Sequence, residues 1–274
     1  MTDRSPKISI ITPSYNQGKF IESAIQSVLR QNHSNFEHII IDNCSQDQTK
    51  EIVKKYNHLV WISEPDKGQS DALNKGFKIA TGDLIGWLNA DDLYLPYCFF
   101  NVGNYYLNNL DIDIFYGNYR WIDETGKLLQ LRQELDLDLF ILKYLHVHYI
   151  PTASVFFRRK IFEEDNYLDT SYNYAMDYEF FLRLALKGYK FARIPAYLAD
   201  FRWHSSSKST QHAQAQIEEK EKALLIYDCN LQKVPLKSRN LIRFFLKIMA
   251  MSKRYLLKLF KGYYFQQWNV YKRI

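Results

Sequence analysis

The sequence predicts an α/β protein with a mostly parallel central sheet that helices cover on both faces. In the first hundred residues, four short apolar runs alternate with segments whose apolar residues recur at helical spacing, which is the pattern of βαβ units. The chain has 274 residues, of which 47% are hydrophobic, so it can bury a core of this kind. Its ten Gly, seven Pro and three Cys exclude a collagen-like chain, a wholly disordered chain and a disulfide framework.

The elements of the first half follow in order along the chain. We expect strands at the apolar runs, over residues 8–11, 38–41, 60–62 and 84–88. Helices are expected between these strands, where apolar residues stand at positions 21, 25, 28 and 29, at 52 and 53, and over residues 70–80. A polar turn follows the second strand.

The pattern changes after residue 92. We expect strands over residues 112–116 and 153–157, and a hairpin whose arms are residues 119–123 and 127–131. A helix is expected from Met176 to Lys187, with Gly188 ending it. No internal repeat and no Pro/Gly-rich linker occurs before residue 231, so we expect residues 1–230 to form one body.

Charge is divided unevenly along the chain. The net charge is +6, yet residues 231–274 hold eleven Lys or Arg and no Asp or Glu, whereas residues 1–230 hold 25 basic and 30 acidic residues. On a helical wheel, a sector of roughly 100° opposite a broad apolar face contains six of the basic residues, Arg239, Arg243, Lys247, Arg254, Lys258 and Lys261. The sequence therefore predicts a basic amphipathic helical tail over residues 231–274.

This tail has two interpretations, and the sequence leaves both open. In the first, residues 235–274 lie in the interface of an anionic membrane, and their basic groups are attracted to lipid headgroups. In the second, the helix docks on the acidic body. Nucleic acid is not expected as a partner, because binding to phosphates would leave the broad Phe, Leu and Met face uncovered.

Three features of the sequence bear on the compartment. The start, MTDRSPK, lacks the apolar run of a secretory signal, and no uncharged apolar stretch reaches the roughly 18 residues of a membrane span. The three widely spaced cysteines favour a reducing environment. We therefore expect a cytoplasmic protein that is peripheral on the inner face of the membrane.

Polar residues follow each of the first four predicted strands, over residues 12–16, 42–43, 64–68 and 89–92. Because ligands bind outside the carboxyl ends of strands in open α/β sheets, these four segments predict a pocket at one sheet edge. Neither GxGxxG nor GxxxxGK[ST] occurs, so a glycine loop does not neutralise the phosphates of a bound nucleotide. Asp91 and Asp92 are hard oxygen ligands, suited to a Mg²⁺ or Mn²⁺ ion that bridges a diphosphate.

Five ordered motifs cover much of the chain from about residue 7 to residue 209. They read ISIITPSYNQGKF, IIIDNCSQDQT, EPDKGQSDALNKGFKIATGDLIGWLNADDLYLP, MDYEFFLRL and FRWHSSSKS. Together they resemble the motifs of the family 2 glycosyltransferases. The resemblance implies the GT-A fold, in which a Rossmann-like sheet forms a nucleotide-sugar half, about residues 1–110, and a smaller antiparallel part belongs to an acceptor half, about residues 111–230.

The same resemblance implies which residues bind the donor. Pro13 and Tyr15 are expected to pack near the base, and Asp42 to accept a hydrogen bond from it. The family pattern after the second strand has two glycines that this chain lacks. The full set of expected donor contacts is Thr12, Pro13, Tyr15, Asp42, Asp71, Asn74, Asn89, Ala90 and Arg202, with Ser207 and Lys208 as further candidates for the diphosphate.

Metal and catalytic residues also follow from the resemblance. Asp91 is expected to ligate Mn²⁺ or Mg²⁺ together with His204, although Asn89 stands where the family more often has the first Asp of its metal motif. Asp177 matches the catalytic base, with Glu179 as runner-up. Glu179 and Trp203 are acceptor-side positions, and Asp92 lies either on the acceptor side or directly behind Asp91. Independently of the resemblance, Trp121 and Trp203 are the aromatic candidates for stacking on a sugar.

The predicted function is inverting transfer of a sugar from a nucleotide-diphosphate donor, with UDP- or dTDP-sugars favoured. The expected acceptor is a glycan or a lipid-linked glycan in cell-surface polysaccharide synthesis. Two alternatives remain. A nucleotidyltransferase would need a basic, glycine-containing loop after the first strand, and a catalytically silent module would bind nucleotide sugar or glycan without transfer.

Overall fold

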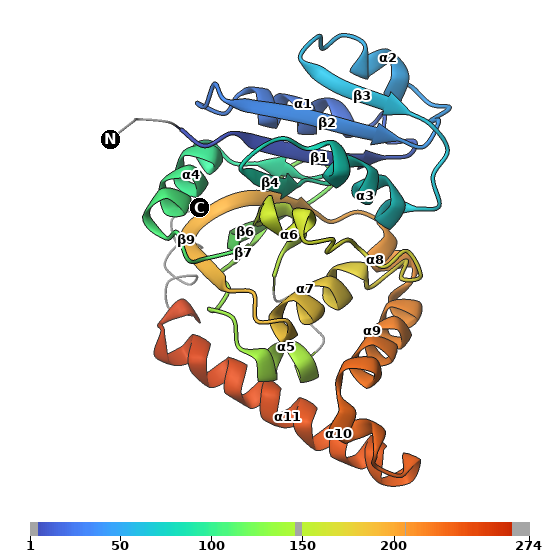
Figure 1. Cartoon of the computed structure of the whole chain (residues 1–274), viewed down its shortest axis with the longest axis vertical. Coiled ribbons are helices and arrows are strands. Elements are labelled where there is room, and N and C mark those ends of the chain that lie inside the picture. Colours follow the sequence, from blue (N-terminus) through green and yellow to red (C-terminus); the bar gives the residue numbers. More distant parts are fainter. Residues whose placement is uncertain (1–4, 146–149, 206, 265–274) are drawn as a thin grey trace.

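The computed structural model describes residues 5–145, 150–205 and 207–264, and its central element is one mixed sheet (Figure 1). The strand order is β3-β2-β1-β4-β8-β6-β9-β5, and β7 pairs with β6 beside this path. The strands are β1 (Ile8–Ser14), β2 (Phe36–Asp42), β3 (Leu59–Ser63), β4 (Leu84–Trp87), β5 (Leu93–Tyr94), β6 (Ile114–Ile122), β7 (Leu128–Arg132), β8 (Val155–Arg158) and β9 (Phe191–Arg202).

The first four strands are parallel and have helices on both faces, as predicted. On β2, Ile39 and Ile41 belong to the cluster that packs against α3 (Gln69–Ile79), whereas Ile40 packs with α1 (Ile21–Leu29) and α2 (Thr49–Val53). This alternation follows from the two-residue period of a strand. Helix α3 approaches β1 closely at Gly76, where a Cβ atom would lie 2.2 Å from Ile11 Cγ2.

The second half differs from the prediction in two strands. β6 is one strand of nine residues that joins the predicted strand at 112–116 to the first hairpin arm, and its register against β9 shifts at Gly117 and Asn118. β9 was not predicted, although it is twelve residues long and pairs in parallel with β6 along most of its length. This strand carries the chain from the far end of the body to Arg202, at the edge where the first strands end.

The remaining helices cover the second half. They are α4 (Cys98–Asn108), α5 (Leu139–Leu145), α6 (Lys160–Glu163), α7 (Met176–Leu186), α8 (Lys208–Gln211), α9 (Ala213–Tyr227), α10 (Cys229–Gln232) and α11 (Leu236–Phe260), and η1 (Thr152–Ser154) is a 3₁₀ turn. The core between α3, α6, α7 and the sheet is aromatic, and stacked or edge-to-face pairs join Phe77, Phe157, Phe162 and Phe180. This packing fixes the start of α7 relative to the sheet.

Helix α11 lies along the lower edge of the molecule against α5 (Figure 1), and four of its cations, together with Lys261 directly after it, pair with acids of the body. Arg254 Nη2 and Lys258 Nζ lie 2.8 and 3.1 Å from the fully buried carboxylate of Glu134. Three further pairs join Lys261 to Asp136, Lys253 to Asp138 and Arg243 to Glu221. The prediction that the basic side faces anionic lipid is therefore wrong for these five residues, and docking on the acidic body is confirmed for them.

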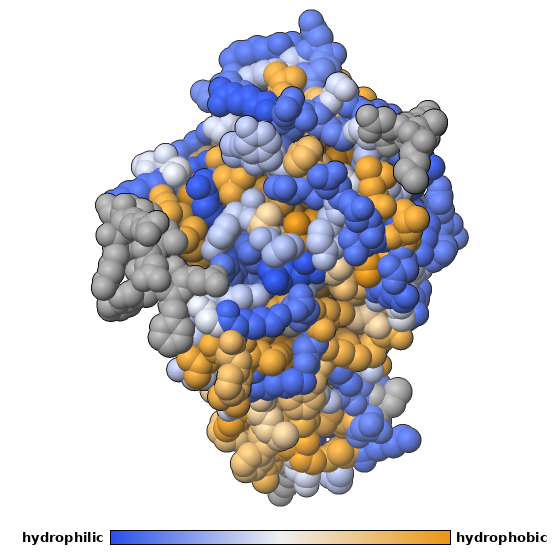
Figure 2. Space-filling model, turned by 90° about the vertical axis from the view of Figure 1, so that its left-hand side faces the viewer, coloured by the Kyte–Doolittle hydropathy of each residue, from blue (hydrophilic) through white to orange (hydrophobic). Residues whose placement is uncertain are grey.

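The opposite, apolar side of α11 is exposed. Figure 2 shows apolar side chains gathered at the lower end of the molecule, where α11 lies in Figure 1. The exposed large apolar residues include Leu236, Leu241, Phe244, Phe245, Met249, Met251, Tyr255, Leu256 and Phe260. Across the described ranges, no helix has the length and apolar composition needed to span a membrane. The end of the predicted tail, residues 265–274, lies outside the described residues.

Candidate functional site

A cavity of about 420 Å³ opens where β1 and β4 end, at the sheet edge that the polar segments predict. Its wall includes the segments after β1, β4 and β9, the starts of α3 and α7, and residues of β6 and α9. Nine predicted site residues line it, namely Pro13, Tyr15, Asn89, Ala90, Asp91, Asp177, Arg202, Trp203 and His204. The fold therefore brings together residues that are up to 191 positions apart in the sequence.

Two predicted donor contacts on the first strands lie outside the cavity wall. Thr12 is fully buried, and its hydroxyl forms a 2.9 Å hydrogen bond with His38 Nε2. Asp42 is also buried, and its carboxylate accepts hydrogen bonds from the Ser45 backbone and from the hydroxyls of Ser45 and Ser63. Both side chains therefore hold β1, β2 and β3 together instead of facing the cavity.

The two predicted contacts on α3 are also used within the protein. The Asn74 amide donates to Leu168 O and accepts from Leu168 N, both at 2.9 Å, which ties α3 to the segment before α7. Asp71 accepts from the Lys67 backbone at 3.0 Å and lies 3.9 Å from Lys75. Asp71 and Asn74 therefore lie outside the cavity wall, to which α3 contributes Gln69 and Ala72 of its first turn.

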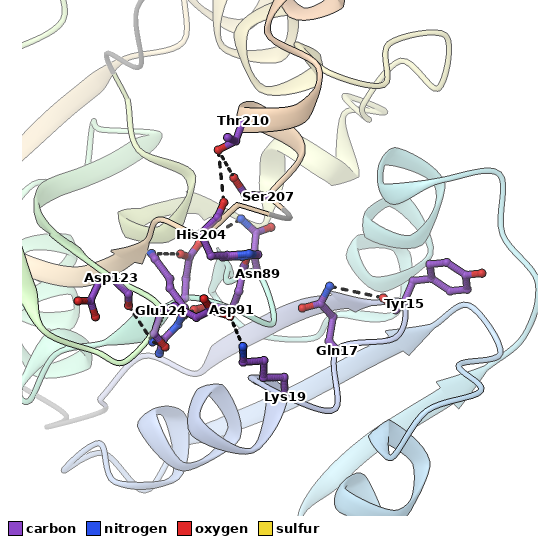
Figure 3. Close-up of polar contacts among 12 residues, drawn as sticks. Tyr15, Gln17, Lys19, Asn89, Asp91, Asp123, Glu124, His204, Ser207 and Thr210 are labelled. Atoms are coloured by element: carbon purple, nitrogen blue, oxygen red, sulfur yellow. Dashed lines mark hydrogen bonds and ion pairs between the residues drawn. The ribbon is translucent and has the colours of Figure 1, made fainter.

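The loops after β1 and β2 interlock at the mouth of the cavity. Asn16 and Cys44 adopt left-handed backbone conformations with φ of 52° and 49°, so the chain turns here without the family glycines. Asn16 N donates to Ser45 Oγ at 2.8 Å, and Asn16 Oδ1 accepts from Gln46 N at 2.9 Å. Tyr15 remains exposed beside the cavity, with its carbonyl accepting from Gln17 (Figure 3).

Asp91 and His204 meet at the cavity wall. Asp91 Oδ2 lies 3.0 Å from His204 Nε2, although 113 residues separate the two in the chain (Figure 3). Among the described residues no cluster of three His, Cys, Asp or Glu side chains forms a complete metal site. A carboxylate and an imidazole that both reach an open cavity fit a Mn²⁺ or Mg²⁺ ion whose other ligands are diphosphate oxygens and water. Asp91 and His204 would hold that ion.

Asn89 and Asp92 support this wall from behind. Asn89 Oδ1 accepts from Gln69 Nε2 and Trp87 Nε1, both at 2.9 Å, and its amide donates to Asp92. Asp92 is buried and accepts from the Arg202 backbone at 2.9 Å, while burial and the charge of Asp91 raise the pKa of Asp92 well above its usual range. Of the two places expected for Asp92, the structure favours the one behind Asp91, because its carboxylate is enclosed below the cavity and does not face an acceptor.

Arg202 fastens three segments to one another. Its guanidinium donates to the carbonyls of Asp91, Asp123 and Glu124, and its carbon Cζ lies 5.2 Å from the centre of the Phe20 ring. These bonds join the end of β4 to the turn between β6 and β7. Lys19 closes the same corner by pairing with Glu124 (Figure 3). Arg202 thus lines the cavity and also fixes the loop that carries Asp91.

Asp177 stands in the first turn of α7 and lines the cavity. The start of this helix is held by Glu219 of α9, whose carboxylate accepts from the backbone N–H groups of Asn173, Tyr174 and Ala175 at 2.7–2.9 Å. These three N–H groups belong to the residues directly before α7, and Ala175 is its N-cap. Glu219 thereby sets the position of the segment that presents Asp177.

Lys220 is the second α9 residue at this helix start. Its side chain is buried, and burial lowers the pKa of Lys220 while the charge of Asp177 opposes that effect. Gln216, one turn earlier on α9, donates to Tyr174 O at 3.0 Å and lines the cavity. Sequence reasoning missed all three α9 residues. The only signal was their i, i+3, i+4 spacing, which places residues 216, 219 and 220 on one face of a helix.

Glu179, the runner-up base, is not in the cavity. Its side chain is only 1% exposed, and its carboxylate is paired with Arg183 at 2.6 Å and accepts from Tyr227 at 2.7 Å. The interpretation of Glu179 as an alternative base or acceptor contact is therefore wrong, because its oxygens already have buried partners. Trp203 does reach the cavity, next to Trp121.

The geometry of this site can now be compared with known proteins. The pattern of glycosyl transferase family 2 matches residues 9–165, more than half of the chain. The chain belongs to this family. An uncharacterized glycosyltransferase of Methanocaldococcus jannaschii is 30% identical over 206 residues, which cover 72% of this chain and 71% of that protein. TuaG of Bacillus subtilis, named for teichuronic acid biosynthesis, is 40% identical over 98 residues, or 34% of this chain and 38% of TuaG.

Solved structures confirm the predicted fold of this glycosyltransferase. Staphylococcus aureus TarS in complex with UDP superimposes with a TM-score of 0.64 at 17% identity, covering 94% of this chain and 74% of the TarS chain. The mannosyltransferase PcManGT of Pyrobaculum calidifontis, with GDP-Man and Mn²⁺, gives 0.62 at 16% identity, covering 91% and 74% of the two chains. The α/β sheet with flanking helices is therefore the GT-A fold.

Proposed function

We propose that this glycosyltransferase moves a sugar, with inversion at its anomeric carbon, from a UDP- or dTDP-sugar to a hydroxyl group of a glycan. The observation that carries the proposal is that one cavity holds both the Asp91–His204 pair and Asp177. The Asp91–His204 pair is suited to binding the diphosphate through a metal ion, and Asp177 is suited to accepting the proton of the acceptor hydroxyl. TarS bound to UDP-GlcNAc and PcManGT bound to GDP-Man share this fold, which supports a nucleotide-sugar donor.

Each wall of the cavity has a separate role in this mechanism. The acceptor oxygen attacks the anomeric carbon while Asp177 accepts its proton, and the bond between that carbon and the diphosphate oxygen breaks. A divalent ion bound by Asp91 and His204 would supply positive charge to the leaving diphosphate. Lys208 lines the same cavity as a further cation, and its Nζ donates to Asn173 O at 3.3 Å. Partial desolvation at the cavity wall lowers the pKa of its ammonium group.

A thermal-shift screen tests the donor and the metal together. With UDP-, dTDP-, GDP- and CMP-sugars at about a hundred times their Kd, a bound donor raises Tm by about 5–10 °C, and we expect this for UDP- or dTDP-sugars with Mn²⁺. The Asp91→Asn variant is expected to lose the part of the shift that depends on Mn²⁺. An equal shift without metal in the wild type, or a shift with GDP-sugars alone, would contradict the proposal.

Glu219→Gln tests whether α9 positions the base. The amide keeps one acceptor oxygen but loses the charge that three N–H groups share, so we expect kcat to fall by about 10- to 100-fold while donor affinity stays within twofold. Glu218→Gln, at an exposed neighbour on the same helix, is the matched control. The Glu219→Asp variant should recover part of kcat. Equal losses of kcat in the two Gln variants would remove the positioning role.

The two alternative functions differ from this proposal in their products. A nucleotidyltransferase would release pyrophosphate from a nucleoside triphosphate. A silent module would bind donor with no transfer and no donor hydrolysis. The departure at Asn89 bears on the second alternative, since the amide of Asn89 bonds to Gln69, Trp87 and Asp92 and adds no carboxylate to the cavity.

The acceptor and the cellular setting are part of the same proposal. TuaG, named for teichuronic acid biosynthesis, supports a cell-surface polysaccharide as the product. We assign donor binding to about residues 1–110 and acceptor binding to about residues 111–230, with residues 231–274 as an attachment segment. Membrane attachment, peripheral and on the inner face, is proposed through the exposed apolar side of α11 instead of its basic side.

A further inference from the structure

Two indole rings stand side by side in the cavity wall. Trp121 of β6 and Trp203, directly after β9, have ring centres 5.6 Å apart and planes tilted by 35°. The backbone sets this arrangement, because β6 and β9 pair in parallel and Trp203 N donates to Ile122 O at 2.8 Å. Trp203 is 41% exposed, so a large apolar ring faces open space at a polar site.

A charged network holds Trp121 in place. The guanidinium carbon of Arg132 lies 4.7 Å from the centre of the Trp121 ring, within the range of a cation–π contact. Arg132 Nε lies 4.0 Å from Glu134 Oε1, and Glu134 is the buried carboxylate that pairs with Arg254 and Lys258 of α11. These contacts hold the Trp121 ring in one position before a ligand binds, which lowers the entropy cost of packing a ligand on the ring.

The place of the two rings within the cavity points to the acceptor. Trp203 lies between Arg202 and His204 in the chain, at the end of the cavity where the diphosphate is proposed to bind. The base is expected near Pro13 and Tyr15, which come from the end of β1. Aromatic rings beside the sugar end of the donor would contact the acceptor, because the acceptor is the molecule that approaches the anomeric carbon.

We propose that Trp121 and Trp203 form the subsite for a cyclic sugar, a pyranose at the end of the acceptor glycan. The C–H groups on one face of a pyranose form a flat apolar surface that packs on an indole ring, whereas its hydroxyls remain free for hydrogen bonds. An acyclic polyol phosphate has no such face. This inference rests on the proposed glycosyl transfer, and it narrows the acceptor to sugar rings.

Saturation-transfer NMR tests the subsite without requiring transfer. The probes are methyl β-D-glucopyranoside, methyl β-D-galactopyranoside and ribitol 5-phosphate, each with and without UDP. We expect saturation of the ring C–H protons of at least one glycoside and none of ribitol 5-phosphate. Trp203→Ala and Trp121→Ala should each reduce the signal at least fivefold, while Trp61→Phe, on β3 and outside the cavity, leaves it unchanged.

The controls separate the subsite from the transfer reaction. Circular dichroism and UDP binding establish that each variant is folded. Glycoside signals that persist in both Trp→Ala variants, or a ribitol 5-phosphate signal that the variants abolish, would overturn the subsite. Glycoside binding that needs both tryptophans, in an enzyme that transfers no sugar from any donor, would refute the proposed function and leave the subsite standing.

Discussion

Asp177→Asn is expected to reduce the rate of sugar transfer by about 10²- to 10⁴-fold, the range that a general base contributes. The amide is nearly isosteric with the carboxylate but does not accept the proton of the acceptor hydroxyl. Donor affinity should stay within twofold, because the Asp91–His204 pair and Lys208 belong to other parts of the cavity wall. Single-turnover rates and calorimetric titration with the donor measure the two quantities separately.

Glu179→Gln provides the contrast to this variant. Glu179 is buried with Arg183, and removing one charge of a buried pair typically costs about 3–5 kcal/mol of stability. We expect a lower midpoint of denaturation, with kcat per folded molecule close to that of the wild type. If Asp177→Asn kept near wild-type transfer and Glu179→Gln lost it in a folded protein, the assignment of the base would be wrong.

The sequence predicted the parts of the fold that depend on local patterns. β1, β2 and β4 contain short apolar runs because both of their faces are buried, and such runs are visible in a single sequence. Strand β9 was missed because the exposed Pro195 and several partly buried positions interrupt its apolar pattern. Its pairing with β6 stabilises it as a strand although its own residues do not show the pattern of one.

The sequence indicates which residues reach the cavity where a strand end alone decides their position. Pro13, Tyr15 and Asp91 line the cavity for this reason. Thr12 was wrong because neighbouring residues at a strand end point to opposite faces, and the sequence does not say which face meets the cavity. Glu219 could not be found, since its partners are backbone N–H groups 44 to 46 residues away.

The sequence contains a signal for which face of α11 packs on the body. Glu134, Asp136 and Asp138 alternate along the chain, so in an extended segment their side chains point the same way. In the structure these three acids meet Arg254, Lys258, Lys261 and Lys253 of α11. The helical wheel gave both faces correctly. The row of acids at Glu134, Asp136 and Asp138 is the feature of the sequence that shows which face of α11 meets the body.

Replacing Phe244, Phe245 and Met249 together by Ser is expected to release the protein from lipid vesicles. All three side chains are exposed on α11, and burying each in the interface contributes about 1.5–3 kcal/mol. Their loss should lower the partition coefficient by a factor of roughly 10² or more. Vesicle co-sedimentation measures it, and a matched triple Ser variant at Phe100, Leu107 and Leu110, which are exposed on and after α4, should bind like the wild type.

The salt dependence of this binding decides between the two faces of α11. Because five of its cations are paired with the body, we expect binding to zwitterionic phosphatidylcholine vesicles, changed less than about threefold between 0.1 and 0.5 M NaCl. A strict requirement for anionic lipid would mean that the helix undocks. Concentration-dependent sedimentation that the triple variant abolishes would instead identify a second copy of the chain as the partner of the apolar face.

Substitution is a sharper test here than deletion of residues 235–274. Deletion removes Arg254 and Lys258 and leaves Glu134 buried without these partners, which costs several kcal/mol and disturbs Arg132 and the Trp121 ring that it supports. Lost activity after deletion would therefore say nothing about membranes. The triple substitution leaves every one of these contacts in place, so transfer to a short water-soluble acceptor should persist while vesicle binding is lost.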